Sequence, residues 1–344
     1  MNYTSFPALD NKWGQLTQRM RATPHNVNPA IPLTRMHYRT LRPLFLFVCA
    51  CWTLTVHAES TLQKKVARIA AEARGTVSAS CLLPGTSLNC DLNSHNKSPM
   101  QSVFKFPLAL TVLHLADIGK LPGQLPGESI DVALDRAVRF LPEDRIARTY
   151  SPLQDRYPEA NVDVSLRELI QLTAGLSDNA ASEVLLRIAG GPAVVQDYVR
   201  SLGIAEFQLQ DGEQTLHRDP TAQYRNWMSP AAAVQMLERL VRNPPLSPVA
   251  NDFLVQVLTA SLTGPNRLRA GIAKGTPLAH KTGTSGEHNG KAEATNDMGF
   301  VTLPDGRRLF IAVFVTDARA NETTRDRVIA QIARAAYEEA LHGH

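Results

Sequence analysis

The sequence predicts a mixed α/β fold of the α+β type, in which one antiparallel sheet is built from both ends of the chain. Strand-like runs occur only near the two ends of the mature chain, whereas the long middle section reads as helices. No low-complexity tract or linker rich in glycine and serine interrupts the chain. We therefore expect an α/β lobe at 59–94 plus 272–344, covered by terminal helices, and an inserted all-α lobe at 95–271. A functional site is expected in the cleft between the lobes.

The first 58 residues are predicted to be a leader with a secretory signal peptide. An apolar core of about 13 residues follows Arg42 and ends at Val56-His57-Ala58, a small-residue cleavage pattern. This core is too short for a convincing membrane span. We take Met36 as the expected start and a periplasmic or secreted protein as the product, and it stays open whether 1–35 are translated. A faint lipobox at Cys51 leaves a lipid-anchored protein as the alternative.

Removal of the leader changes the charge and the cysteine content. The leader carries six Lys or Arg residues and one Asp, so the formal net charge falls from +4 to −1. The charge is therefore no argument for a nucleic-acid partner. Two cysteines remain, Cys81 and Cys90, on either side of a Pro84-Gly85 turn between strand-like runs. This spacing predicts a disulfide across a hairpin in an oxidising compartment, with a pair of free thiols as the alternative.

The individual elements follow from local patterns. A helical stripe over 60–74 ends at Gly75, and a second one covers 323–341. Capping motifs at Ser165, Ser229 and Ser247 begin helices in the middle section. Five strand-like runs are expected, at 76–82, 87–92, 280–284, 298–303 and 309–316.

The segment Ser102-Val103-Phe104-Lys105 is the first candidate for chemistry. The residues after Phe106 are apolar enough for a helix buried on nearly all sides, and Pro107 fits only in or near its first turn. Ser102 and Lys105 are then at i and i+3 near a helix N-terminus. A lysine in a dry site can take the proton of a serine, and free N–H groups suit an oxyanion. Alone the pattern is weak, because a surface serine and a solvated lysine match it equally.

Three further segments are candidates for the same site. Ser177-Asp178-Asn179 places a hydroxyl and an amide at a loop-to-helix junction, where an ordinary N-cap is the alternative. Lys281-Thr282-Gly283-Thr284 lies on a predicted strand, and its glycine permits another backbone or a ligand to come close. Glu213 lies in a polar loop between helices, where an acid is ordinarily solvated.

Together these segments resemble the motif set of class A serine β-lactamases and penicillin-binding proteins. The motifs S-x-x-K, S-D-N and K-T-G occur in this order, with a glutamate loop between the second and third. The resemblance runs from about Thr61 to the C-terminal helix. It implies a five-stranded antiparallel sheet in a three-layer αβα arrangement, and hydrolysis of penicillins and cephalosporins through a serine acyl-enzyme, which gives antibiotic resistance. Similarity to the PER-like extended-spectrum branch rests on Gln101, Glu213 with His217, 223–227 and 280–297.

The resemblance implies a catalytic role for four side chains and two backbone groups. Ser102 is similar to the acylated nucleophile, and Lys105 to the residue that deprotonates it. Ser177 matches the hydroxyl that passes a proton to the leaving nitrogen, and Glu213 the carboxylate that activates the hydrolytic water. The N–H groups of Ser102 and Thr284 match the oxyanion hole. Whether Lys105 or Glu213 takes the serine proton in acylation stays open.

Five residues match substrate-binding groups of the family. Asn179 resembles the amide that holds the carbonyl of the substrate side chain. Lys281, Thr282 and Thr284 resemble the group that binds the substrate carboxylate. Arg267 is placed like an arginine that some members use for the same carboxylate, and an exposed arginine is the alternative.

Three features depart from the family pattern. Asp211 occupies the position where many members have an arginine that ties the loop to an acid at its far end. His217, which we also count as substrate-binding, stands where an asparagine commonly helps to hold the water. The segment 285–296 is expected to be longer and looser, and to widen the cleft for bulky cephalosporins.

Two other functions share part of this pattern. A DD-peptidase of the penicillin-binding type has three of the motifs but no deacylating glutamate, and a non-hydrolysing β-lactam sensor would need a membrane tether. No metal or other cofactor is expected, because the histidines lack zinc-binding spacing. The predicted partner is a small-molecule β-lactam, with no nucleic acid, no stable membrane partner and a monomeric chain.

Overall fold

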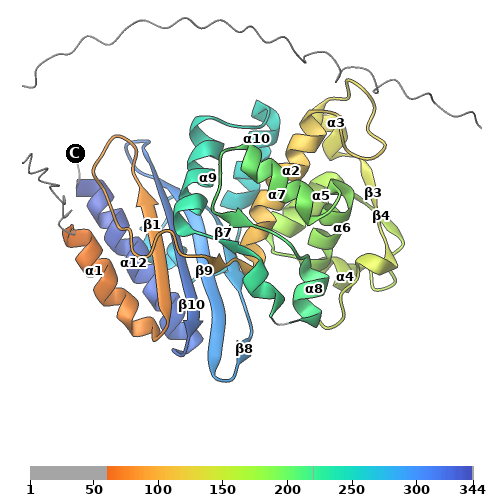
Figure 1. Ribbon diagram of the computed structural model, residues 1–344. Coiled ribbons are helices and arrows are strands. Elements are labelled where there is room, and N and C mark those ends of the chain that lie inside the picture. The colour runs from red at the N-terminus through yellow and green to blue at the C-terminus, as the bar shows by residue number, and fades with distance from the viewer. Residues whose placement is uncertain (1–59, 220, 343–344) are drawn as a thin grey trace, which may run out of the picture. The chain divides into compact units, whose positions relative to one another are not determined.

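A five-stranded antiparallel sheet organises the computed structural model, which describes residues 60–219 and 221–342 (Figure 1). The strand order is β1-β10-β9-β7, and β8 pairs with β9. The strands are β1 (Thr76–Leu82), β7 (Leu278–Thr284), β8 (Glu287–His288), β9 (Lys291–Thr302) and β10 (Arg308–Ala318). The prediction of one antiparallel sheet is therefore confirmed. The predicted leader at 1–58 lies outside the described residues.

Two hydrophobic cores lie on the two faces of this sheet. On β10, Val313 and Val315 pack in the core that α1 and α12 share, whereas Ala312 and Phe314 pack in the core of the middle helices. This alternation is the period of two that a strand buried on both faces requires. The terminal helices are α1 (Thr61–Ala70) and α12 (Glu322–His342). Figure 1 shows them together on one side of the sheet and the middle helices on the other, the predicted three layers.

Helix α1 begins at a capping box that the sequence did not single out. The Ser60 hydroxyl accepts a hydrogen bond from the backbone N–H of Gln63, and the Gln63 side chain accepts one from Ser60 N. Such reciprocal caps satisfy donors that would otherwise have no partner at a helix start. After a turn of 3₁₀ helix the chain passes into β1 through Gly75. A Cβ at Gly75 would lie 2.5 Å from Ala318 Cα, so only glycine fits there.

The middle section is mostly helical, as predicted. Ser165, Ser229 and Ser247 are the N-caps of α5, α9 and α10, so these capping predictions are confirmed. Two small sheets accompany the helices: β3 (Ala137–Phe140) pairs with β4 (Val162–Ser165), and β6 (Trp227–Met228) pairs with β2 (Ser98–Pro99) and β5 (Phe207–Gln208). The helices are α2 (Lys105–Asp117), α3 (Ile130–Leu134), α4 (Pro152–Arg156), α5 (Leu166–Ile170), α6 (Asn179–Ala189), α7 (Pro192–Ser201), α8 (Glu213–Arg218), α9 (Pro230–Arg242), α10 (Pro248–Thr259) and α11 (Leu268–Gly271).

The prediction of a strand at 87–92 is wrong. Only Leu92 pairs with the sheet, in a single bridge to Ala79. The Asn89 side chain accepts a hydrogen bond from Asp91 N at 2.8 Å, which turns the backbone locally, and Asn89 O accepts one from the Ser60 hydroxyl at 3.1 Å. These contacts bind the segment to the start of α1, and only its end reaches β1, through Leu92, the Asp91 side chain and Cys90.

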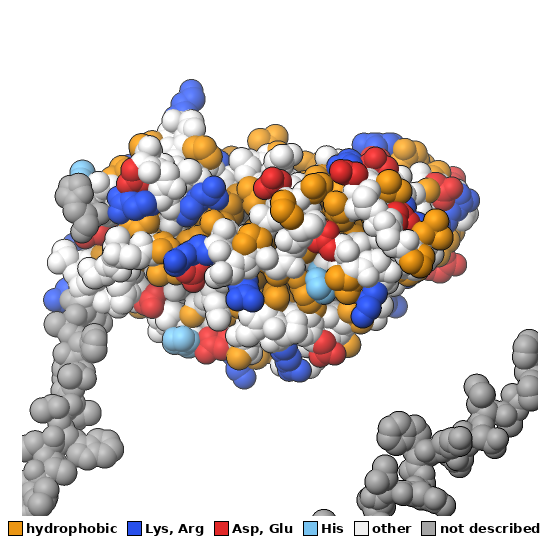
Figure 2. All heavy atoms as spheres, turned by 90° about the horizontal axis from the view of Figure 1, so that it is seen from above, with side chains coloured by type: hydrophobic (Ala, Val, Ile, Leu, Met, Phe, Trp, Pro, Cys, Tyr) orange, Lys and Arg blue, Asp and Glu red, His pale blue; other side chains and the backbone are white. Residues whose placement is uncertain are grey.

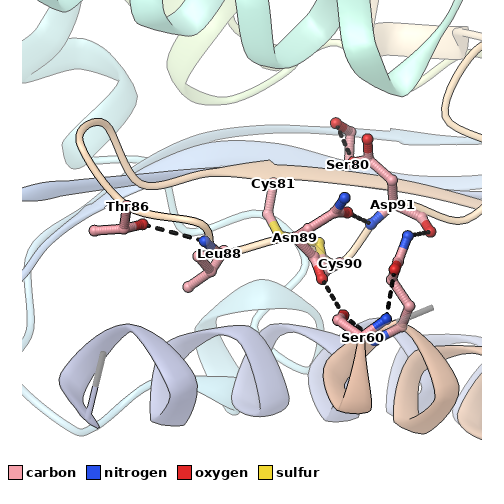
Figure 3. The surroundings of a disulfide bond; sticks show 9 residues. Ser60, Ser80, Cys81, Thr86, Leu88, Asn89, Cys90 and Asp91 are labelled. Carbon is pink, nitrogen blue, oxygen red and sulfur yellow. Dashed lines mark hydrogen bonds between the residues drawn. A yellow bond between two sulfur atoms is a disulfide. The ribbon is translucent and has the colours of Figure 1, made fainter. Parts of the chain in front are cut away.

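The predicted disulfide is present between Cys81 and Cys90 (Figure 3). The two Cα atoms are 5.6 Å apart, within the usual span of a disulfide. The bond joins β1 to the segment that contacts Ser60, and both cysteines lie in the core beneath α1 and α12. It therefore ties the N-terminal helix to the sheet on the face turned away from the middle helices.

Two further predictions of local structure are wrong. Glu213 does not lie in a loop but is the first residue of α8, whose N-cap is Gly212. The segment 285–296 is not loose, because Asn289 and Gly290 form a tight turn between β8 and β9 with φ of 55° and 66°. Positive φ at both turn residues is the geometry that a two-residue hairpin needs.

The surface carries charges of both signs. Figure 2 shows acidic and basic side chains interspersed over the face seen from above, in agreement with the small net charge predicted for the mature chain. No helix within 60–219 and 221–342 is long and apolar enough to span a membrane.

Candidate active site

Ser102 and Lys105 lie where a turn of 3₁₀ helix at Gln101–Phe104 runs into α2. Lys105 is fully buried, and its Nζ donates a hydrogen bond to Ser102 Oγ at 3.0 Å. Pro107 is the third residue of α2, where its missing N–H costs nothing. The predicted i, i+3 contact on a buried helix is therefore present. Gln101 holds φ at 47°, one of the strained conformations that cluster at functional sites.

The ammonium group of Lys105 connects three segments of the site. It donates to Ser177 O at 2.8 Å and to Asn179 Oδ1, and it forms an ion pair with Glu213 Oε1 at 2.9 Å. A buried lysine without partners would be very costly, and these oxygens offset that cost. The nucleophile candidate, the S-D-N motif and the glutamate thus meet at one nitrogen.

Glu213 is held at this position by the packing of α8 on α6. Its side chain is only 7% exposed, and Oε1 accepts no hydrogen bond from any described residue, because the contact with Lys105 has ion-pair distance without hydrogen-bond geometry. The next residue, Gln214, donates its backbone N–H to Glu183 Oε1 at 3.1 Å. Burial raises the pKa of the Glu183 carboxyl. This contact fixes the first turn of α8 and with it the Glu213 carboxylate.

The loop before α6 presents Ser177 and Asn179 through a buried cap. The Asp178 carboxylate accepts hydrogen bonds from Ala181 N at 2.9 Å and from the Ser151 hydroxyl at 2.7 Å. It thereby acts as the N-cap of α6, and Ser177 is forced to φ of 64°. The sequence suggested the helix start but gave no sign of Ser151, because that contact spans 27 positions.

Lys281 faces Lys105 across Ser177. Its Nζ donates to Ser177 Oγ at 2.9 Å and to Thr282 O at 2.8 Å. Burial, and next the charge of Lys105, hold the pKa of Lys281 well below its usual value. The strand can approach because of Gly283, where a Cβ would lie 2.3 Å from Met100 O in the segment before Ser102. This close approach is what the glycine in the K-T-G motif was expected to permit.

Arg267 lies beneath the outer end of β7. It is 3% exposed, so the alternative of an exposed arginine does not apply. Its Nε donates to Asp326 at 2.7 Å, and its terminal nitrogens donate to Thr284 Oγ1 at 2.9 Å and to two strand carbonyls. Thr282 in turn donates to Thr263 Oγ1 at 2.8 Å. Thr263 and Asp326 are polar partners that the motifs did not indicate.

Two cavities meet beside Ser102. The first, of about 270 Å³, extends toward α8 and the β8–β9 hairpin and is bordered by Glu213, His217 and Glu293. The second, of about 440 Å³, extends toward Thr282 and Arg267. Ser102, Asn179 and Thr284 border both. The first cavity therefore presents two carboxylates, whereas the second presents the Arg267 guanidinium and hydroxyls together with Glu322 and Asp326, the latter paired with Arg267.

The two ends of the segment around α8 are joined by an ion pair whose acid is at the start and whose arginine is at the far end, the reverse of the family pattern. Arg225, at its far end, donates to Asp211 at 2.8 Å and to Asp219 at 3.1 Å. His217 is exposed on α8, and its Nε2 lies 3.3 Å from Arg148 O. Asp211 therefore still forms an ion pair across the segment, although the charges have changed places. His217 contacts the backbone carbonyl of Arg148. Among residues 60–219 and 221–342 no cluster of His, Cys, Asp and Glu could hold a metal ion.

Comparison with known proteins gives a consistent picture. A model described as "Beta-lactamase enzyme family" matches residues 61–340. The extended-spectrum beta-lactamase PER-1 of Pseudomonas aeruginosa is 38% identical over 247 residues, which are 72% of this chain and 77% of that protein. The beta-lactamase VEB-1 of the same species is 32% identical over 283 residues, or 82% and 88% of the two chains.

Solved structures agree with these sequence matches. A beta-lactamase from Chitinophaga pinensis is 38% identical with a TM-score of 0.75, and the match covers 82% of this chain and 100% of that one. The TLA-1 extended-spectrum beta-lactamase is 31% identical, also with a TM-score of 0.75, and the match covers 80% and 97%.

Proposed function

Because the chain belongs to the β-lactamase enzyme family and is a class A serine β-lactamase, a hydrolase of β-lactam antibiotics that gives resistance, we propose that Ser102, Lys105, Ser177 and Glu213 are its catalytic residues. One observation carries the proposal. The Nζ of Lys105 lies 3.0 Å from Ser102 Oγ and 2.9 Å from Glu213 Oε1, so one buried amine joins the nucleophile to a carboxylate. In this arrangement the serine can receive the acyl group, and the carboxylate can activate the water that removes it.

In the acylation step, Ser102 Oγ attacks the lactam carbonyl carbon and gives its proton to the Lys105–Glu213 pair. The backbone N–H groups of Ser102 and Thr284 stabilise the oxyanion. When the carbon–nitrogen bond breaks, the nitrogen takes a proton from the Ser177 hydroxyl, which accepts a hydrogen bond from Lys281. Ser177 regains a proton from the buried lysines, so the protons balance.

In the deacylation step, Glu213 takes a proton from the water that attacks the acyl carbon. The ester bond to Ser102 then breaks, and the proton returns to the serine oxygen. The buried carboxylate of Glu213, 2.9 Å from Lys105 Nζ and on the wall of the first cavity beside Ser102, suits a base of this kind. His217, exposed on the next turn of α8, would help to place the water.

The substrate is oriented by the two unlike cavities. Its carboxylate would bind in the second cavity through Lys281, Thr282, Thr284 and Arg267, whose guanidinium already donates to Thr284. Its acylamino side chain would then enter the first cavity, with the carbonyl held by Asn179. We propose that penicillins and cephalosporins are substrates, bulky oxyimino cephalosporins included. A broad range is in keeping with the name of the relative PER-1, an extended-spectrum beta-lactamase.

The Glu213→Ala variant tests the assignment. Acylation by benzylpenicillin should proceed while hydrolysis of the ester stops, because no base remains for the water. Intact mass spectrometry should show the protein mass increased by one whole penicillin. The Ser102→Ala variant is the control and should show no adduct. A Glu213→Ala protein that turns over without accumulating adduct would remove Glu213 from the deacylation step.

The alternative of a DD-peptidase makes a different prediction. Such an enzyme would release D-alanine from a peptide ending in D-Ala-D-Ala, whereas a β-lactamase should hydrolyse nitrocefin rapidly and leave the peptide intact. A hydrolysis panel of a penicillin, an oxyimino cephalosporin and a carbapenem then gives the substrate range. Loss of efficiency for the oxyimino compound alone would contradict the proposed range.

We also propose that the protein is an exported monomer with the lobes predicted from the sequence, 59–94 plus 272–344 and 95–271. The disulfide supports an oxidising compartment such as the periplasm. N-terminal sequencing of the periplasmic protein should begin at Glu59 if the leader is cut after Ala58, and a lipid-modified Cys51 would identify the anchored form. Size-exclusion chromatography with light scattering checks the monomer.

A further inference from the structure

Glu293, on β9, is a buried carboxylate at the wall of the first cavity. It is 6% exposed. Its Oε1 lies 3.3 Å from Nδ1 of His288, a side chain that is 55% exposed, and its Oε2 accepts no hydrogen bond from any residue in 60–219 and 221–342. Burying a carboxylate oxygen without a donor is costly. Nothing in the catalytic proposal uses this residue.

The cations Lys291 and Arg325, which lie on or contact the β8–β9 hairpin, are each engaged by another acid. Arg325, buried beneath the hairpin, donates to Glu287 at 2.9 Å and to Thr295 at 2.9 Å. Lys291 pairs with Asp317 at 2.9 Å. In the described part of the chain only His288 comes within ion-pair distance of Glu293. Its charge is therefore not matched by a permanent cation.

Glu213, the other acid that borders the first cavity, does have a permanent cation beside it. Glu213 has Lys105 at 2.9 Å, so its charge is already compensated. Among the described residues, the remaining titratable side chains that border the cavity are His217 and His288, and no described Lys or Arg borders it. The cavity therefore carries an excess of negative charge, and Glu293 is its source.

The orientation of the substrate brings its side chain to this charge. The substrate carboxylate is drawn to the second cavity by Arg267 and Lys281, and the bond to Ser102 forms where the cavities meet. The acylamino group must then extend into the first cavity, between α8 and the β8–β9 hairpin. In a partly buried cavity an ionic interaction is stronger than it is in water.

We propose that Glu293 is a specificity-determining residue that favours β-lactams whose acyl side chain carries an ammonium group and disfavours those whose side chain carries a carboxylate. The proposal rests on the proposed function, since it assumes that the acyl side chain lies in the first cavity. The proposal names a preferred class of β-lactam, which the proposed catalytic residues alone do not predict.

Three penicillins that differ only at one carbon test the proposal. Benzylpenicillin, ampicillin and carbenicillin share the nucleus and the phenyl ring, and they carry hydrogen, an amine and a carboxylate at the same carbon. At about pH 7 the amine is largely protonated and the carboxylate is ionised. We measure kcat/KM for each and take benzylpenicillin as the reference.

The Glu293→Gln variant removes the charge and keeps the shape. The ratio of ampicillin to benzylpenicillin should fall by about three- to tenfold, and the ratio of carbenicillin to benzylpenicillin should rise by a similar factor. The change should lie mainly in KM, because the interaction is already made in the bound substrate. Thermal unfolding of the variant should occur at the same or a higher temperature, since a buried charge has been removed.

The Glu287→Gln variant is the matched control. Glu287 lies on the same hairpin, but its carboxylate contacts Arg325 and it does not border the cavity. Its ratios should equal those of the unchanged protein. Equal ratios in the Glu293→Gln variant would overturn the inference and leave the catalytic proposal intact. If the unchanged protein hydrolyses none of the three penicillins, the proposed function fails first.

Discussion

At the scale of single residues, the site depends on two buried lysines with different tasks. Lys105 has a carboxylate beside it, whereas burial lowers the pKa of Lys281. A lysine with a lowered pKa can pass a proton to Ser177 more readily than an ordinary one. It loses its charge at a lower pH, however, and the charge is what would bind the substrate carboxylate.

The pH dependence of the reaction should show this conflict. Because the neutral form of Lys281 binds the carboxylate poorly, kcat/KM for benzylpenicillin should fall as the pH rises through the pKa of Lys281, well below 10.5. In the Lys281→Arg variant the alkaline fall should move to higher pH, because a guanidinium keeps its charge, although kcat should be lower throughout. Steady-state kinetics over the alkaline range gives both profiles. An alkaline fall at the same pH in both proteins would contradict the assignment.

At the scale of elements, the segment that carries α8 is held by Arg225. This arginine joins Asp211 and Asp219, while Asn226 accepts hydrogen bonds from Gln210 N and Asp211 N at 2.9 and 3.0 Å. The family pattern led us to expect an arginine at the start of this segment, and the chain has the charges in the opposite order. The ends of the segment are joined all the same, which keeps Glu213 beside Lys105.

Loss of this ion pair should slow deacylation more than acylation. Arg225→Ala removes contacts that are partly exposed, so we expect little loss of stability and a several-fold slower release of the acyl group. The double variant Asp211→Arg with Arg225→Asp should recover part of the rate, because the ion pair is restored in reverse order. The fraction of acyl-enzyme at steady state, measured by rapid quench and mass spectrometry, separates the two steps.

Arg218→Ala is the control for this experiment. Arg218 is exposed on α8, and among the described residues its Nε donates to Gln214 O in its own helix alone. Its substitution should leave the acyl-enzyme fraction unchanged. If Arg225→Ala and Arg218→Ala behave alike, Arg225 does not position the segment.

At the scale of the whole molecule, the disulfide and the active site lie on opposite sides of the sheet. Cys81 and Cys90 belong to the core beneath α1 and α12, whereas the apolar side chains of α2, the helix that begins at Lys105, belong to the other core. Stability and catalysis should therefore respond differently to the loss of this bond.

The double variant Cys81→Ser with Cys90→Ser should lower the free energy of unfolding by about 2 to 3 kcal/mol, because a short loop is no longer closed in the unfolded chain. The kinetics with benzylpenicillin at 25 °C should stay within about twofold, since no catalytic contact changes. Urea unfolding and steady-state rates measure the two effects. A large loss of activity in a fully folded variant would show that the two faces are coupled.

The sequence predicted those parts of the fold and the site that depend on local pattern. The buried helix after Ser102 and the caps at Ser165 and Ser229 follow from local spacing, and the meeting of the motif residues is implied by the resemblance to the family. The errors arose where distant contacts decide the structure. Residues 87–92 contact Ser60 and reach β1 only at their end, so they form no strand, and Glu213 enters a helix because α8 packs on Glu183.

Some partners in the site could not be found in this way. Asp326 and Thr263 reach Arg267 and Thr282 from elements far apart in the chain, and no motif marks them. Glu293 is likewise unremarkable in the sequence, because an acid on a strand near a turn is usually solvated. Only its burial and its place in the cavity wall distinguish it.

The pairing of Thr76 with Thr316 has a consequence for how the protein is made. During synthesis β1 is among the first segments of the folded part to emerge, and its partner β10 is among the last. The Ser102 segment and the middle helices are complete before β7, β9 and β10 exist to close the sheet over them. Folding of the catalytic centre must therefore wait for nearly the entire polypeptide, and β1 needs protection from wrong pairing until then.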